Sequence, residues 1–152
     1  MSRQKDKGTC EHCHRDFGYF LVHNGFNDST YAYCEKCGQT ALLDGWKMPK
    51  GLTVKIHQSI TSEAESFLKL CPCGGTFRSN ANPRCPHCLQ PLSADAVAEF
   101  IERNAPGTVK GWRWQRNWTG LYCILIEDRV VKDNWNEKAL YFQSKITTST
   151  KT

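Results

Sequence analysis

Cys10-Glu11-His12-Cys13 is the first of four closely spaced cysteine pairs in this sequence. The other three are Cys34-Glu35-Lys36-Cys37, Cys71-Pro72-Cys73 and Cys85-Pro86-His87-Cys88, so eight of the nine cysteines lie between residues 10 and 88. When one or two residues separate two cysteines, both thiolates can reach one ion from a tight turn, and two such pairs complete a four-thiolate zinc site. The four pairs therefore predict two structural Zn²⁺ ions, bound by Cys10, Cys13, Cys34, Cys37, Cys71, Cys73, Cys85 and Cys88.

The N-terminal residues favour metal binding over disulfide bonds. Residues 1–7 are polar and charged, and no apolar segment typical of a secretory signal peptide follows them before Cys10. We therefore expect a cytoplasmic protein, and in a reducing compartment cysteines at this spacing bind metal. A membrane helix needs roughly 18–20 apolar residues, and no run in the sequence approaches that length.

The charge of the chain gives little information about its partner. The formal net charge of the 152 residues is +5 when the cysteines are neutral. Two Zn²⁺ ions add four positive charges and eight thiolates remove eight, which leaves the metal-bound protein close to neutral. The mildly basic composition is therefore weak support for nucleic-acid binding.

Residues 10–38 resemble a zinc ribbon, the class in which a β-hairpin lies between two cysteine pairs. Gly18–His23 and Thr30–Tyr33 are rich in strand-forming residues, and Asn24-Gly25 between them is a strong hairpin signal. Gly38 follows the second pair, where a left-handed residue is useful. The resemblance implies one ion held by Cys10, Cys13, Cys34 and Cys37, with no coordination position open to a substrate.

Residues 71–88 also resemble a zinc ribbon, with a short loop between the pairs. The resemblance implies a second ion held by Cys71, Cys73, Cys85 and Cys88. The first pair departs from the usual spacing because one residue, Pro72, separates its cysteines and has no N–H group to offer a sulfur. A capping box at Ser62-Glu63-Ala64-Glu65 predicts a helix of about two turns that ends before Cys71. We expect His12, His14 and His87 to be exposed turn residues.

The C-terminal part contains one clear helix and a predicted sheet. Ser93 is a suitable N-cap, and Val97, Phe100 and Ile101 form one apolar face before Asn104. Three strands of an antiparallel meander are predicted at Val109–Gln115, Leu121–Ile126 and Arg129–Lys132. The second strand is apolar on both faces, so Cys123 within it is expected to be buried.

These patterns predict a small α+β fold: two zinc-ribbon-like four-cysteine units, an amphipathic helix and a C-terminal three-stranded antiparallel sheet. The first unit spans residues 1–50, and the second, with its flanking helices, spans residues 51–107. The β-meander covers residues 108–144, and residues 145–152, rich in Thr, Ser and Lys, are expected to be a disordered tail.

The motifs of several enzyme classes are absent. The sequence contains no P-loop, no G-x-S-x-G, no H-E-x-x-H, and no H-x-E of the zinc-deaminase type. We therefore expect a non-catalytic structural-zinc protein that binds a macromolecular partner. A protein partner is favoured, with the chain acting as an adaptor, a regulator or an immunity-type inhibitor.

Two other functions stay open. A nucleic-acid-binding protein would use a segment in which aromatic and basic residues alternate, together with Lys36, Arg78 and Arg84 near the cysteine pairs. The same tryptophans would equally suit the core of a small sheet. A redox-active dithiol protein would need an exposed, low-pKa cysteine. The alternating segment supplies the candidate nucleic-acid contacts Trp112, Arg113, Trp114 and Arg116.

Overall fold

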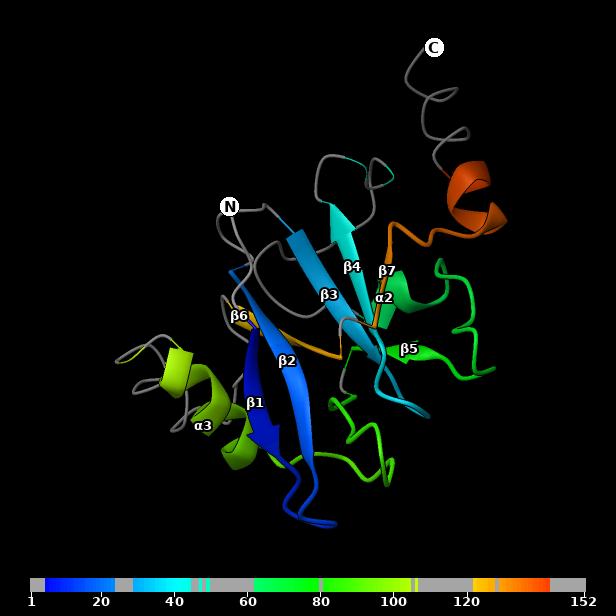
Figure 1. The fold of residues 1–152 in the computed structure, drawn as a ribbon. Helices are drawn as coiled ribbons and strands as arrows, with labels where there is room; N and C mark the ends of the chain where they lie inside the picture. Colours follow the sequence, from blue (N-terminus) through cyan, green and yellow to red (C-terminus); the bar gives the residue numbers. More distant parts are fainter. Residues whose placement is uncertain are drawn as a thin grey trace.

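The computed structural model describes residues 5–23, 29–44, 47, 49, 62–79, 81–104, 106, 122–127 and 129–142. Within them, two sheets pack together: a three-stranded sheet of order β1-β2-β6 and a four-stranded sheet of order β5-β3-β4-β7 (Figure 1). All strand pairs are antiparallel except β4 with β7, which is parallel. The strands are β1 (Lys5–Thr9), β2 (Asp16–His23), β3 (Ser29–Cys34), β4 (Thr40–Asp44), β5 (Phe77–Arg78), β6 (Tyr122–Ile126) and β7 (Val130–Lys132).

Each of the first two cysteine pairs lies in the loop of a hairpin. Strands β1 and β2 are paired up to Thr9 and Asp16, so Cys10 and Cys13 lie in the six-residue loop between them. Strands β3 and β4 are paired up to Tyr33 and Thr40, and their loop holds the second pair.

The predicted hairpin between residues 18–23 and 30–33 is therefore wrong, because β2 and β3 belong to different sheets. The Asn24-Gly25 signal itself lies outside the described residues. Strand β2 instead lies between β1 and the apolar strand β6, whose residues Cys123–Ile126 are all buried. Burial of that apolar strand outweighs local turn propensity.

The predicted C-terminal meander is also wrong in its pairing. Strands β6 and β7 form where expected, but β6 joins β2 and β7 joins β4. The predicted strand at residues 109–115 lies outside the described residues, as does the expected tail at 145–152. Strand β6 is apolar on both faces, so other elements must cover it on two sides. Residues of β3 and of the helix at residues 94–104 belong to the same buried cluster as β6.

The helix predicted after Ser93 is confirmed as α3 (Ala94–Asn104). The Ser93 hydroxyl accepts the N–H of Ala96 at 3.1 Å, and Val97, Phe100 and Ile101 are buried. The helix predicted before Cys71 is shorter than two turns: α2 is Ser62–Glu65. Among the described residues, no helix has the length and apolar character needed to span a membrane.

Residues 137–142 form a further helical segment that the sequence patterns did not predict. The Asn136 side-chain oxygen caps it by accepting the N–H groups of Lys138 at 2.9 Å and Ala139 at 3.3 Å. Figure 1 shows this helix, in orange, beside the green segment that follows α2. An asparagine before a short helix-forming run was the available signal.

Strand β6 is held to the second sheet by the hydroxyl of Tyr33. That hydroxyl donates to the Ile124 carbonyl and accepts the Ile124 N–H, both at 3.2 Å. Tyr33 and Ile124 are fully buried, so the contact satisfies two peptide groups that water cannot reach. Burial also raises the pKa of Tyr33 well above its ordinary value, which keeps the hydroxyl protonated.

We predict that Tyr33→Phe lowers the free energy of unfolding by about 1–3 kcal/mol, because the buried Ile124 N–H loses its hydrogen-bond acceptor. Urea denaturation of the metal-loaded protein measures this loss. Thr40→Val is the control. The Thr40 hydroxyl lies 3.5 Å from the Ile124 carbonyl but forms no hydrogen bond with the Ile124 N–H, so we expect a smaller loss of stability. Equal stability of Tyr33→Phe and the unaltered protein would contradict the role given to this contact.

Candidate metal centres

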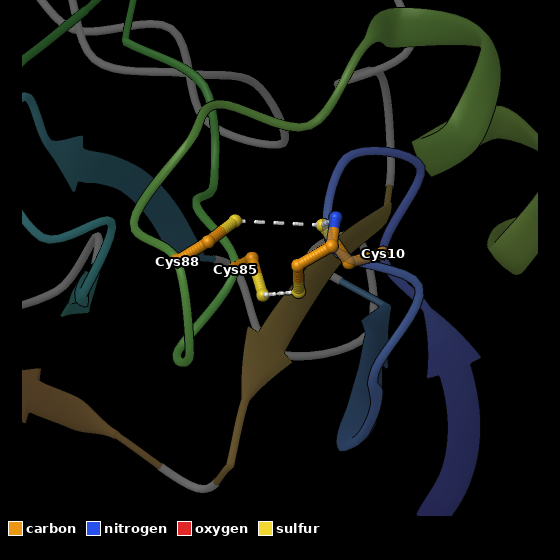
Figure 2. A group of neighbouring side chains, drawn as sticks. Cys10, Cys85 and Cys88 are labelled. Atoms are coloured by element: carbon orange, nitrogen blue, oxygen red, sulfur yellow. Dashed lines mark hydrogen bonds between the residues drawn. The ribbon is translucent and has the colours of Figure 1, made fainter.

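The eight cysteines form two groups of four whose sulfur atoms lie within 4.8 Å of one another. We call Cys10, Cys13, Cys85 and Cys88 the outer centre, and Cys34, Cys37, Cys71 and Cys73 the inner centre, because the second set is nested within the first along the chain. Figure 2 shows the outer centre, with Cys85 and Cys88 on one loop facing Cys10 on another.

This grouping corrects the ligand sets implied by the zinc-ribbon resemblance. The structure does not bring Cys10 and Cys13 together with Cys34 and Cys37, nor the third pair together with the fourth. The first two pairs lie in the loops of separate hairpins in different sheets, so they cannot share an ion. Each of these two cysteine pairs instead lies beside a pair from later in the chain: the first pair beside the fourth, and the second pair beside the third.

The sulfur separations fit a bound metal ion. Cys10 and Cys88 are 3.7 Å apart at Sγ, as are Cys13 and Cys85. In the inner centre the corresponding separations are 3.5 Å for Cys34–Cys73 and Cys37–Cys71. A tetrahedral ion with sulfur ligands at about 2.3 Å requires about 3.8 Å between sulfurs. A disulfide requires about 2.05 Å, and all these cysteines are free.

Three of the four cysteine pairs lie in backbone turns that share the same hydrogen-bond pattern. The first cysteine donates its N–H to the carbonyl five residues later: Cys10 to Arg15 at 3.0 Å, Cys34 to Gln39 at 2.9 Å, and Cys85 to Gln90 at 3.1 Å. Its carbonyl accepts the N–H four residues later, from His14, Gly38 or Leu89. The shared pattern aims both sulfurs of each pair in one direction.

The Cys71-Pro72-Cys73 pair keeps this turn with one residue fewer. Cys71 donates to the Gly75 carbonyl at 2.9 Å and accepts the N–H of Gly74 at 2.8 Å. The departure from the usual spacing therefore shortens the turn without destroying it, and Pro72 is the one residue left between the two cysteines.

The residue that closes each turn has a left-handed backbone. The φ angle is 61° at His14, 78° at Gly38, 61° at Leu89 and 92° at Gly74. Glycine adopts this region freely, whereas a side chain costs about 1–2 kcal/mol. The prediction of a left-handed Gly38 is confirmed, and His14 is exposed.

Backbone N–H groups surround the sulfurs and set their pKa values. Burial alone would raise the pKa of Cys10, but N–H groups of Cys13 and His12, at 3.4 and 3.3 Å, lower it to about 7. Burial is likewise outweighed at Cys73, where the N–H of Gly75 lowers the pKa to about 7. At Cys85 burial dominates and raises the pKa to about 12. Each centre therefore has one thiol that ionises readily, and metal binding must displace protons from its buried thiols.

Two histidine side chains link the two turns of the outer centre, because each forms a hydrogen bond to a carbonyl that follows the other turn. His12 Nε2 donates to the Pro91 carbonyl at 3.0 Å, and His87 Nε2 donates to the Asp16 carbonyl at 2.9 Å. Each histidine is the third residue of its turn, and each carbonyl follows the opposite turn. The outer centre thus has an approximate two-fold arrangement. Each imidazole is a clasp, by which we mean a side chain that hydrogen-bonds one turn to the other, rather than a ligand.

Three basic residues near the cysteine pairs serve the loops themselves. Arg78 pairs with Glu35 at 3.2 Å, and the Lys36 amine reaches the Cys73 carbonyl at 3.5 Å. The Arg84 guanidinium donates to the Leu89 carbonyl at 2.7 Å. The other candidate nucleic-acid contacts, Trp112, Arg113, Trp114 and Arg116, lie outside the described residues.

The two centres touch at Gly38. A Cβ at this position would lie 2.3 Å from the backbone nitrogen of Arg84, the residue before Cys85. Gly38 belongs to the inner centre and Arg84 leads into the outer one, so the absence of a side chain lets the two centres pack directly. No sequence pattern indicated this contact.

We predict that Gly38→Ala is more destabilising than Gly74→Ala. Both substitutions put alanine at a positive φ, which costs about 1–2 kcal/mol. At Gly74 the new Cβ meets nothing within 4 Å, whereas at Gly38 it also meets Arg84 backbone. The free energy of unfolding, measured by denaturation of the two variants, tests the difference. Equal losses would mean that the centres are not packed through this glycine.

We also predict that His12→Ala and His87→Ala each weaken metal binding at the outer centre by roughly 10-fold, because supporting hydrogen bonds orient the ligand loops. Competition with a metal chelator measures the affinity of each centre. His14→Asn is the control, since asparagine tolerates the left-handed backbone and His14 lies at the exposed end of its turn. A control loss as large as that of the two clasp variants would contradict the clasp.

Comparison with known proteins gives one family. The model of a family described as "Domain of unknown function (DUF8255)" matches residues 6–94. Searches of curated proteins and of solved structures find no match. The matched region covers more than half of the chain and contains all eight cysteines of the two centres. The chain therefore belongs to the DUF8255 family.

Proposed function

We propose that this chain is a non-catalytic protein in which two structural zinc ions hold an apolar surface that binds a protein partner. Thiolates are soft ligands and suit Zn²⁺, and in each centre four of them would fill a tetrahedral ion's coordination sphere. An ion with no open position does not bind substrate. We place the protein in the cytoplasm, where reduced thiols remain available to metal.

The observation that carries the proposal is an apolar pocket of about 500 Å³ beside the helix at residues 137–142. Phe67 and Phe142 lie with ring centroids 5.2 Å apart within it. Tyr141 also lines it and is 65% exposed, while the adjacent Leu140 is 67% exposed. Large apolar side chains gathered at a concave surface are typical of a protein-binding site.

The charges around the pocket favour a protein over a nucleic acid. Its lining contains one acid, Glu137, and one base, Lys138, so it presents no excess of positive charge to phosphates. Lys36, Arg78 and Arg84 are engaged by the cysteine loops, as described above. A partner with apolar side chains at its centre and charges of both signs at its rim matches this surface.

The inner centre supports the pocket through a short chain of contacts. Phe67 belongs to the segment that leads into Cys71, and its carbonyl accepts the N–H of Asn136 at 2.9 Å. Lys69 donates its N–H to Asn134 at 2.8 Å, and Leu68 bridges to Trp135. The pocket residues Phe67 and Phe142 pack on the buried cluster that includes three inner cysteines. An ion at the inner centre would therefore order both sides of the pocket.

The proposal is tested with a photo-crosslinking residue in place of Tyr141. We expect ultraviolet light to join it in cell extract to one protein, unchanged by nuclease treatment. The second substitution Leu140→Asp should remove the product, because a charge on the apolar surface opposes burial. Leu89→Asn is the control: Leu89 is also an exposed leucine, at 44%, but it belongs to the Cys85–Cys88 turn and not to the helix at residues 137–142 that borders the pocket.

Metal content distinguishes loss of the surface from loss of the fold. Leu140→Asp should retain the same zinc per chain as the unaltered protein, because Leu140 is an exposed residue of the helix at residues 137–142, outside the loops that carry the cysteines. A crosslinked product that disappears on nuclease treatment would move nucleic acid to first place. A product that survives Leu140→Asp but is lost with Leu89→Asn would contradict the pocket as the binding site.

A further inference from the structure

Cys73 differs from the other cysteines of the two centres in its exposure. Among these eight residues, all of which the structure describes, Cys73 is the exposed one, whereas Cys34, Cys37 and Cys71 are buried. In the outer centre every cysteine is buried or half-buried. An exposed thiolate is the point at which a solution reagent can reach such a centre.

The residue that lies beside the Cys73 sulfur is a glycine. Gly75 lies against this sulfur: a Cβ on Gly75 would be 3.3 Å from Cys73 Sγ and 2.7 Å from the Lys36 Cβ. Glycine provides no side chain to cover the sulfur. The amine of Lys36, on the facing Cys34–Cys37 loop, lies 3.5 Å from the Cys73 carbonyl and places a positive charge beside the Cys73 turn, which favours an anionic leaving group.

A second thiolate lies within reach. Cys34 Sγ is 3.5 Å from Cys73 Sγ, and a disulfide would need the sulfurs to approach by about 1.5 Å more. A Cβ on Gly75 would lie only 2.6 Å from Cys34 Sγ, so a residue with a side chain would not fit at position 75 without moving this sulfur pair. Cys34 is buried, so it is placed to react with Cys73 rather than with the solution.

We propose that Cys73 is an oxidation site through which peroxides open the inner centre. The Cys73 thiolate attacks one oxygen of hydrogen peroxide, the O–O bond breaks, and the other oxygen leaves as hydroxide. Cys73 is then a sulfenic acid, oxidised by two electrons. The Cys34 thiolate attacks that sulfur, the S–S bond forms, and a second hydroxide leaves.

The balance of this reaction is two thiolates and one peroxide converted to one disulfide and two hydroxides, with both electrons taken from sulfur. Cys37 and Cys71 alone remain as thiolates in the inner centre, too few to hold the ion. The outer centre keeps all four of its thiolates. Peroxide should therefore release one zinc ion per chain before the second.

The experiment treats the zinc-loaded chain with hydrogen peroxide and follows zinc release with a chromogenic chelator. Cys73→His keeps four ligands but removes the attacking sulfur, so release should be at least about 10-fold slower. Cys88→His makes the same change at the outer centre and should leave the rate of the first release unchanged. Peptide mapping after alkylation should find the Cys34–Cys73 disulfide when one zinc has been released.

A measurement on the unaltered protein covers the case in which Cys73→His does not load two ions. A limiting amount of N-ethylmaleimide should label Cys73 before any other cysteine, since access decides the order. First labelling of Cys13 or Cys88 would overturn the proposal. So would a first disulfide confined to the outer centre, or equal release rates for Cys73→His and the unaltered protein.

Discussion

Four sulfur atoms that meet across two backbone turns are the constraint on which both sheets depend. Cysteine side chains of the two centres form part of both buried clusters: Cys10 and Cys85 in one, and Cys34, Cys37 and Cys71 in the other. A metal ion bound at either group would stabilise the fold, since a structural zinc site contributes on the order of 10–16 kcal/mol to folding in small zinc-binding peptides. That free energy is comparable to the whole stability of an ordinary domain.

Because one centre is nested within the other along the chain, the two centres join different parts of the fold. The inner centre joins the β3–β4 loop to the loop that precedes β5, and it holds the four-stranded sheet together. The outer centre joins the β1–β2 loop to the loop before α3, so it connects the first strands of the chain to the helix that covers them. Closing the inner loop first shortens the chain that the outer centre must close, which lowers the entropy cost of closing it. The close approach of Gly38 to the Arg84 backbone then packs the two centres against each other.

The two centres also differ chemically. The outer centre has two turns of equal length and a histidine clasp from each, and its sulfurs are all buried or half-buried. The inner centre has one shortened turn, which leaves Cys73 exposed, and a lysine where the outer centre has histidine. It also packs under the aromatic pocket, so its integrity and the shape of that surface are linked.

Local sequence determined several features of this protein. Cysteine spacing indicated all eight members of the two candidate metal centres, Ser93 and the apolar face after it indicated α3, and the apolar run at residues 122–126 indicated β6. These features depend on residues close together in the chain, where turn geometry and side-chain periodicity act directly. Tertiary structure alone decided which cysteine pairs meet, because each pair offers two thiolates from a tight turn and could complete a site with any other pair. Strand partners were decided in the same way: burying β6 required β2 beside it and the β3 tyrosines against it, and that selection acts between residues about 90 positions apart, where turn signals carry no information.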